Sequence, residues 1–369
     1  MHVLTVNAGS SSVKLRVLGA DDELLAAPAL PADRGELDRD QLARALAEMP
    51  EPDAIGHRIV HGGERFQDPV RIDAAVERAL RELIDLAPLH QPKSLAALDA
   101  VSDALPGVPA VACFDTAFHA TIPAAAATYA LPLRWRRRFG LRRYGFHGLS
   151  HSYAARRAAE MLDERPRRLI VCHLGAGASL AAIADGRSVD TTMGFTPLEG
   201  LVMATRSGSV DPGMLLWLLE REALDEREMG EALEHESGLL GLAGTPDMPR
   251  LLERIAAGDR DAELARDVYV HRLRGHIAMM AASLGGIDAL VFTGGVGENS
   301  AEIRSLAAAG LEFLSVALDE RANADAQGDC AISAQNSRVT ALVIEAREDL
   351  EIAAQVRTLL GGSDQPSHA

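Results

Sequence analysis

Short apolar runs bounded by turn residues alternate along this chain with longer segments of helical spacing. The apolar runs predict strands at residues 3–6, 13–17, 54–60, 108–114, 169–172, 180–183, 289–292 and 339–344. The longer segments, several with capping residues, predict helices at residues 36–49, 73–86, 94–104, 150–162, 211–221, 261–284, 301–309 and 349–360. Strands that alternate with helices indicate an α/β fold.

The turn between the first two predicted strands is Asn7-Ala8-Gly9-Ser10-Ser11-Ser12, and Lys14 follows it. Glycine lets the backbone approach a ligand closely, and hydroxyl, amide and ammonium groups can hold phosphate oxygens. The same residues also suit an ordinary serine-rich hairpin turn. Both interpretations stay open for this turn alone.

Two further glycine-rich turns follow apolar runs, at residues 173–179 and 293–300. The second of them leads into a predicted helix, whose N-terminal N–H groups favour anions. None of the three turns fits the P-loop pattern or the dinucleotide pattern G-x-G-x-x-G. Two strand–turn–strand phosphate loops instead indicate two similar halves that close on one nucleotide, as in the actin, sugar-kinase and Hsp70 group.

Composition narrows the class of protein further. A chain of 369 residues with 47% hydrophobic content is long enough for two domains. No apolar run approaches the roughly 20 residues of a membrane span, and no signal peptide is visible. Cys113, Cys172 and Cys330 are widely spaced, which is typical of reduced thiols in a cytoplasmic protein.

The net charge of −16 argues against nucleic-acid or anionic-membrane binding. The basic segment at residues 134–143 is a local exception. It is either a solvated surface or a positive lip that steers anionic substrates.

Four short clusters place chemically versatile side chains at the ends of apolar runs or among glycines: Arg58, Asp115, His147 and Arg206. Each has an ordinary structural alternative, such as a surface ion pair, a helix cap or a turn residue. Their occurrence together with three phosphate-type turns favours a catalytic site.

Nine segments in this order resemble the acetate kinase family nearly end to end. They are VNAGSSSVK at 6–14, GHRIVHGGERF at 56–66, LAPLHQP at 86–92, VACFDTAFH at 111–119, YGFHGLSH at 144–151, MGFTPLEGL at 193–201, ATRSGSVDPG at 204–213, VFTGGVGENS at 291–300 and EDLEIA at 348–353. The resemblance implies two RNase H-like (actin-like ATPase) lobes with the active-site cleft between them. Residues 1–119 with about 351–369 would form the first lobe, and about 120–350 the second, which would bind nucleotide and form a homodimer.

The resemblance also implies a reaction, the reversible Mg²⁺-dependent transfer of a phosphoryl group from ATP to acetate, with Mn²⁺ as a possible substitute. Acetate is ionised at pH 7, so no strong general base is needed. By similarity, Arg58 binds the substrate carboxylate, Arg206 stabilises the moving phosphoryl group and His147 hydrogen-bonds to it. Asp115 matches the catalytic aspartate, and we expect it to orient an arginine or a metal-bound water.

Further roles follow from the same resemblance. Asn7 and Glu348 match the metal positions. The acyl pocket would use Arg58, Val60, Leu89, Phe146 and Pro197. The nucleotide positions are Lys14, Ser10, Ser12, His173, Leu174, Gly175, Ala176, Gly177, Asp247, Met248, Pro249, Gly295, Val296, Gly297, Glu298 and Asn299.

Three positions depart from the family pattern. Ala176 replaces an asparagine, Pro249 displaces the following Arg250 by one residue, and Arg347 replaces an asparagine beside Glu348. The leading hypothesis is an acetate kinase with small-molecule substrates. The alternatives are a propionate-preferring acyl kinase, a catalytically weak nucleotide-binding regulator and, least favoured, a purely structural actin-like protein.

Overall fold

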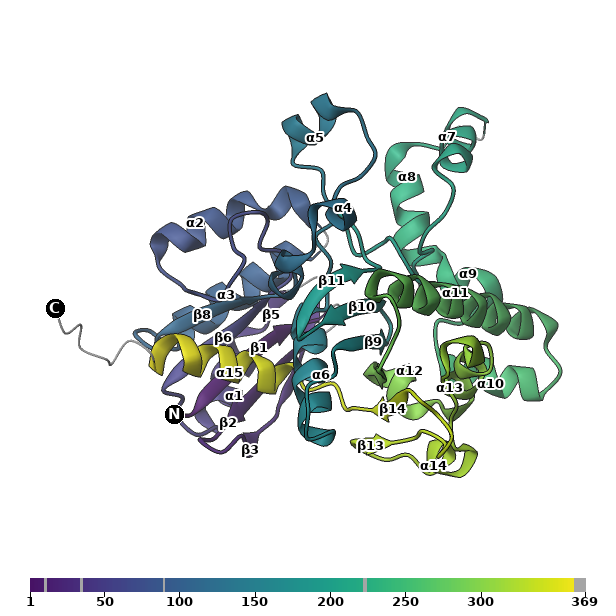
Figure 1. Cartoon of the computed structure of the whole chain (residues 1–369). Coiled ribbons are helices and arrows are strands. Elements are labelled where there is room, and N and C mark those ends of the chain that lie inside the picture. The colour runs from purple at the N-terminus through teal and green to yellow at the C-terminus, as the bar shows by residue number, and fades with distance from the viewer. Residues whose placement is uncertain (10–11, 34–35, 89, 222–223, 362–369) are drawn as a thin grey trace. The chain divides into compact units, whose positions relative to one another are not determined.

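The computed structural model describes residues 1–9, 12–33, 36–88, 90–221 and 224–361. The chain divides into two compact units, each built around its own sheet (Figure 1). The first unit contains residues 1–120, 146–153 and 347–369, and the second contains 121–145 and 154–346. In the part of the chain that is described, no helix is both long and apolar enough to cross a membrane.

The sheet of the first unit has the strand order β5-β4-β2-β1-β6-β8-β7, with β3 paired to β2. β1 is antiparallel to β2 and parallel to β6, which is parallel to β8. The strands are β1 (Val3–Ala8), β2 (Ser12–Leu18), β3 (Leu24–Ala26), β4 (Ala29–Asp33), β5 (Glu36–Leu37), β6 (Ala54–Ile59), β7 (Val70–Arg71) and β8 (Ala110–Phe114).

Helices cover both faces of this sheet. On one face, α15 (Glu348–Gly361) packs Ile352 and Val356 against apolar side chains of β1, β2 and β8. On the other face lie α1 (Arg39–Ala47), α2 (Ala74–Glu82) and α3 (Gln91–Ala104). The C-terminal helix, yellow in Figure 1, therefore completes the unit that the N-terminal strands begin.

The sheet of the second unit has the order β11-β10-β9-β12-β14-β13. β9 is antiparallel to β10 and parallel to β12, which is parallel to β14. Its strands are β9 (Arg168–Leu174), β10 (Ala178–Ala184), β11 (Arg187–Thr191), β12 (Ala289–Thr293), β13 (Cys330–Ala331) and β14 (Thr340–Val343). A hairpin followed by parallel strands thus occurs in both units, and the predicted α/β class with two similar halves is confirmed.

The helices of the second unit are mostly short. They are α4 (Ala124–Ala127), α5 (Leu133–Phe139), α7 (Pro212–Arg221), α8 (Glu226–Glu231), α9 (Gly238–Ala243), α10 (Met248–Ala256), α11 (Arg260–Leu284), α12 (Gly294–Asn299), α13 (Ala301–Ala308) and α14 (Glu320–Ala324). Helix α11 is the longest of those described. It begins after the Asp259 cap and ends at Gly285, which is left-handed (φ 67°) as a C-terminal glycine allows.

Short helical turns complete the element list: η1 (Ile84–Leu86), η2 (Ala117–Thr121), η3 (Ala232–Glu236) and η4 (Glu312–Leu314). Helix α6 (Gly148–Met161) contributes its first residues to the first unit and the rest to the second.

The structure corrects three local predictions. Residues 294–299 form helix α12 rather than a loop, because the Glu298 carboxylate accepts the N–H of Gly294 and closes the first turn. Helix α6 begins at Gly148, so Ser150 lies inside the helix and is not its cap. Residues 36–37 are strand β5, and the first helix begins after Asp38, whose side chain accepts from two backbone N–H groups.

The basic segment is helix α5 and the loop after it. No residue of α5 is buried, whereas Arg143 is half-buried and forms an ion pair with Glu199. Most of the segment is therefore solvated, as its first interpretation predicts.

Cys113 and Cys172 are buried free thiols in strands, and Cys330 is half-buried. Burial raises the pKa of the first two thiols well above the usual range, which makes them unreactive.

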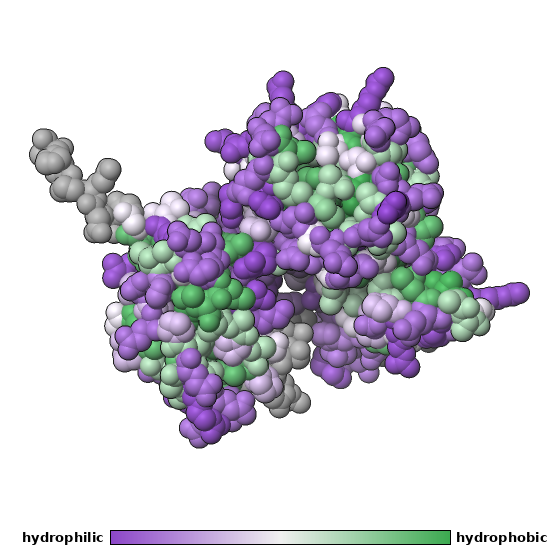
Figure 2. Space-filling view, turned by 90° about the horizontal axis from the view of Figure 1, so that it is seen from below, coloured by the Kyte–Doolittle hydropathy of each residue, from purple (hydrophilic) through white to green (hydrophobic). Residues whose placement is uncertain are grey.

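Hydrophilic residues dominate the face in Figure 2, and apolar residues gather there in separate patches.

One buried histidine makes the stability of the first unit depend on pH. His57 in β6 is 1% exposed, and among the described residues neither ring nitrogen has a hydrogen-bond partner. By strand alternation its ring shares the face of Ile55 and Ile59, which α3 covers. Burial lowers the pKa of His57 to about 4, because a buried cation loses its hydration.

We expect the free energy of unfolding to be greatest above pH 6.5, where His57 is neutral in both the folded and unfolded states. Between pH 6.5 and 4 only the unfolded chain binds the proton, so stability falls by up to about 3 kcal/mol from this residue. His57→Leu removes that loss. Urea denaturation followed by circular dichroism at several pH values measures it, with exposed His271→Leu as the control. Equal pH slopes in His57→Leu and the wild type would contradict the prediction.

Candidate active site

A buried ion pair joins two parallel strands of the first unit. Arg58, in β6, donates Nε to both carboxylate oxygens of Asp115 at 3.0 and 3.1 Å, and Nη2 to Oδ2 at 2.6 Å. Asp115 directly follows β8, the parallel neighbour of β6. Because parallel strands end at the same sheet edge, the apolar runs of the sequence bring these two side chains together.

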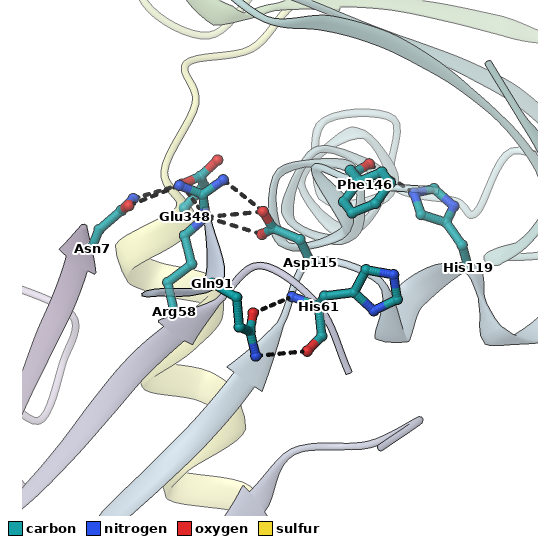
Figure 3. A network of polar contacts seen from close by, with 8 residues as sticks. All are labelled: Asn7, Arg58, His61, Gln91, Asp115, His119, Phe146 and Glu348. Atoms are coloured by element: carbon teal, nitrogen blue, oxygen red, sulfur yellow. Dashed lines mark hydrogen bonds and ion pairs between the residues drawn. The ribbon is translucent and has the colours of Figure 1, made fainter. Parts of the chain in front are cut away.

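Two more residues complete a polar network at this edge (Figure 3). Asn7, near the end of β1, accepts a hydrogen bond from Arg58 Nη1 at 2.9 Å and donates Nδ2 to Glu348 Oε2 at 2.7 Å. Glu348 is the first residue of α15, and its Oε2 lies 3.8 Å from Arg58 Nε. Four separate elements therefore supply one cluster, which includes four of the sequence-predicted residues.

Electrostatics keeps the Arg58 side chain charged although it is only 16% exposed. Burial by itself lowers the pKa of Arg58, but the charges of Asp115 and Glu348 outweigh it and raise the pKa above the ordinary value. Burial raises the pKa of Asp115, the nearby Glu348 charge adds to that, and Arg58 opposes both. A guanidinium whose geometry is set by two carboxylates can orient a planar anion.

The first turn lies beside this cluster. In the β1–β2 register Lys14 is opposite Asn7, so the two side chains share a face of the hairpin, and Lys14 is exposed. Ser12 begins β2, and Gly9 N–H donates to Ser12 O at 2.8 Å. Ser10, and Leu89 of the predicted acyl pocket, lie outside the described residues.

The segment Phe146-His147-Gly148 reaches the same side of the first unit. Gly148 N–H donates to Asp115 O at 2.8 Å, and a Cβ on Gly148 would fall 2.2 Å from that oxygen, so only glycine fits. His147 adopts the left-handed conformation (φ 56°), which is uncommon for a side-chain-bearing residue and recurs at functional sites. Phe146 and Val60 are buried.

In the second unit, Arg206 and Pro197 lie together. Arg206 Nε is 3.0 Å from Glu234 Oε2, and Nη1 donates to Pro197 O at 3.4 Å. Burial lowers the pKa of Arg206, and the charge of Glu234 opposes that shift. Glu234 is not among the sequence-predicted residues, because the run Glu234-His235-Glu236 has the pattern of a solvated turn.

The second and third glycine-rich segments, residues 173–179 and 293–300, are adjacent in this unit. His173 pairs with Thr293 across β9 and β12, and a Cβ on Gly294 would fall 2.9 Å from Leu174 O. Gly175 N–H donates to Gly177 O at 3.0 Å, and Ala176 between them is exposed. The strand register therefore brings two predicted nucleotide segments to one edge.

The remaining predicted nucleotide residues have local partners. Glu298 accepts N–H groups from Gly294 and Ala346, and Asn299 donates to Gly295 O, while Val296 and Gly297 lie within the same short helix. Asp247 caps α10 by accepting the N–H of Arg250. Pro249 is in the first turn of α10, where a missing N–H costs nothing, and Met248 is buried.

Comparison with known proteins supplies an independent identification. The model of the Acetokinase family matches residues 34–354. An acetate kinase of Synechococcus sp. (strain JA-2-3B'a(2-13)) is 51% identical over 321 residues, 86% of this chain and 79% of the relative. The crystal structure of Porphyromonas gingivalis acetate kinase superposes with a TM-score of 0.89 and 37% identity, covering 97% of this chain and 99% of the other. A propionate kinase from Francisella tularensis subsp. tularensis SCHU S4 superposes with a TM-score of 0.90 and 35% identity over the same shares.

We expect Arg58 and Asp115 to be strongly coupled in stability. Asp115→Ala leaves a buried cation with fewer partners and should lower the free energy of unfolding by about 3–5 kcal/mol. Arg58→Met with Asp115→Ala should lose much less than the sum of the single changes. A double-mutant cycle from urea denaturation measures the coupling, and the exposed pair Arg167–Asp185, 3.7 Å apart, is the control. Additive single effects at Arg58 and Asp115 would contradict the expectation.

Proposed function

The chain belongs to the acetokinase family, and we propose that the cluster around Arg58 is the part of its site that holds the acyl substrate. The protein is an acetate kinase, a phosphotransferase with a carboxyl group as acceptor and ATP as co-substrate. The observation that supports the proposed location is the buried Arg58–Asp115 pair at the sheet edge.

In this proposal Arg58 binds the acid, and Asp115 fixes the orientation of the Arg58 guanidinium. Acetate is already ionised at neutral pH, so its oxygen attacks phosphorus without a base. Both oxygens of Asp115 are engaged by Arg58, which suits a residue that orients a guanidinium rather than one that removes a proton.

Arg206 and His147 act on the phosphoryl group. Catalysis of phosphoryl transfer is mostly positioning and charge stabilisation. An arginine stabilises the negative charge on the equatorial oxygens of the phosphoryl group. Glu234 holds the Nε side of Arg206 and so limits its rotation. The left-handed backbone of His147 is a strained conformation of the kind that is retained where a side chain must point in one direction.

Mg²⁺ is the proposed metal, and Asn7 with Glu348 would hold it. One carboxylate and one amide oxygen are hard donors of the type that Mg²⁺ prefers. Among the described residues there is no group of three or more His, Cys, Asp or Glu side chains that could hold a metal ion. Two protein side chains are few ligands, and Mg²⁺ typically keeps several waters and shares nucleotide phosphates. When bound, it neutralises phosphate charge.

The nucleotide segments of the second unit would contact ATP mainly through backbone N–H groups. Ala176 lacks a side-chain donor, and the Glu298 carboxylate already accepts two backbone N–H groups. These two features by themselves would also suit a catalytically weak nucleotide-binding regulator. Against it, the chain keeps every charged side chain of the proposed acyl and phosphoryl chemistry.

We expect the acid to be short, because the two proposed pocket residues of the first unit, Val60 and Phe146, are apolar and buried. One methylene is worth only about 1–3 kcal/mol of discrimination. Propionate is therefore the second candidate substrate, and the structural similarity to an enzyme described as a propionate kinase supports testing it.

A homodimer in the cytoplasm is the proposed state of the enzyme. Helix α7, Pro212-Gly-Met-Leu-Leu-Trp-Leu-Leu-Glu-Arg221, has no buried residue, and Met214, Leu216 and Trp217 are exposed. Such an apolar helix favours coverage by a second copy. The reduced cysteines fit a cytoplasmic location.

Acyl-phosphate formation tests the proposed function. The purified protein with Mg-ATP is given acetate, propionate or butyrate, and hydroxylamine traps the product as a coloured hydroxamate. We expect product with acetate and a lower kcat/KM for each longer acid. A higher kcat/KM with propionate would favour the second substrate, and no product with any acid would favour the regulator.

Arg206→Ala should lower kcat more than a hundredfold, because a buried transition-state charge contact is worth at least about 3 kcal/mol. KM for acetate should change little. Steady-state kinetics with exposed Arg321→Ala as the control measure both constants. Turnover near the wild-type value would rule out the role given to Arg206.

Leu216→Glu with Trp217→Glu should convert the homodimer to a monomer, since two carboxylates cannot be buried at an apolar contact. Sedimentation velocity gives the mass. Phe313→Glu changes another exposed apolar side chain of the same unit, 72% exposed, and should leave the dimer intact. A dimer that survives the double change would place the interface elsewhere.

A further inference from the structure

The backbone just after β6 is held by side chains at three successive residues. His61 N–H donates to Gln91 Oε1 at 3.2 Å, Gly62 N–H to Thr116 Oγ1 at 3.0 Å, and Gly63 N–H to the ring nitrogen His61 Nδ1 at 2.8 Å. Each buried N–H that lacked its acceptor would cost free energy. The path of this segment therefore depends on three particular side chains.

Gln91 makes the most extensive of these contacts. Its amide is fully buried at the start of α3, and besides accepting from His61 N–H it donates Nε2 to His61 O at 3.3 Å (Figure 3). Nε2 also donates to Leu80 O at 3.4 Å. The site needs an acceptor and a donor on one planar group. An amide supplies both, whereas an ionised carboxylate or an apolar side chain does not.

His61 links this clamp to Phe146. Since Nδ1 accepts from Gly63, the proton of the neutral ring is on Nε2, and burial lowers the pKa of His61 to about 4. The imidazole meets the Phe146 ring edge-on, with 5.5 Å between centroids. Phe146 O lies 3.0 Å from His119 Nε2, so Phe146 is contacted at its ring by one histidine and at its backbone by another (Figure 3).

We propose that Gln91 is a positioning residue that, through His61, fixes two walls of the acyl pocket and thereby sets how strongly the enzyme discriminates between acids of different length. One wall is Val60, which immediately precedes the clamped residue, and the other is Phe146. The inference rests on the proposed function, which places both residues at the acid. Gln91 itself acts only through the backbone and ring of His61.

Gln91→Met tests the proposal, because it keeps the side-chain length and removes both hydrogen-bonding functions. We expect KM for acetate to rise about fivefold, the effect of losing roughly one buried hydrogen bond. The ratio of kcat/KM for acetate over propionate should fall about threefold or more as the pocket loosens, a change of about 0.7 kcal/mol. KM for ATP should stay within about twofold of wild type, the scatter expected for an untouched site.

Gln67→Met is the matched control, because Gln67 is an exposed amide that donates to Glu64 O. It should leave both acid constants unchanged. Circular dichroism confirms that each variant is folded. If Gln91→Met does not fold, Thr116→Val provides the test, since it removes the acceptor of Gly62 N–H at nearly constant volume and should lower the same ratio.

Gln91→Glu adds a readout that a purely structural role would not produce. At high pH the introduced carboxylate faces the carbonyl oxygens of His61 and Leu80, so the acetate preference should fall. At lower pH the protonated carboxyl can donate again, and the preference should recover, while the wild-type ratio stays constant.

The outcomes separate the two ideas. Wild-type protein that forms no acyl phosphate overturns the proposed function and the inference with it. Active wild type together with folded variants of unchanged acetate-to-propionate ratio overturns the inference alone. A lowered ratio in Gln91→Met, restored at low pH in Gln91→Glu, supports it.

Discussion

The pairing of Arg58 with Asp115 is the interaction on which the proposed acyl site depends. An arginine that is largely removed from solvent is tolerated where carboxylates offset the loss of hydration, and Asp115 and Glu348 provide them. The same contacts fix the orientation of the guanidinium. In the proposed site, stability and substrate binding would therefore draw on one set of charges.

The surroundings of this pair are built from neutral polar groups. Gln91, Thr116 and the ring of His61 accept successive backbone N–H groups, so the segment after β6 has a defined path without further charge. Burial keeps His61 and His119 neutral at physiological pH. A site for a small anion gains from this arrangement, because rigid neutral walls limit size while one cation provides attraction.

The second unit repeats the topology of the first, a hairpin followed by parallel strands, but carries different polar residues and two glycine-rich segments. In this unit Arg206 pairs with Glu234, which lies on an irregular helical turn (η3). The two glycine-rich segments of the unit meet through the pairing of β9 with β12. Ala176 is exposed in its turn, and Pro249 lies in the first turn of α10. Pro249 in particular stands where a helix needs no N–H.

Much of this could be predicted from residue patterns. The β1–β2 hairpin, the strands that end near Arg58 and Asp115, and the helix that starts after Asp211 all follow from local periodicity and turn chemistry, which act between neighbours in sequence. The loop expected at residues 294–299 was wrong because its first turn is closed by the Glu298 carboxylate, a contact that no residue pattern encodes.

The sequence by itself determined the α/β class, the family and which side chains carry charge at strand ends. Only the tertiary structure decided the partners of the polar side chains: Asn7 with Glu348, 341 positions apart, Arg206 with Glu234, and Gln91 with the backbone of His61. The physical reason is that strand and helix propensities act over a few residues, whereas a buried charge or amide selects its partner through space, after the sheet has set which strand ends lie side by side.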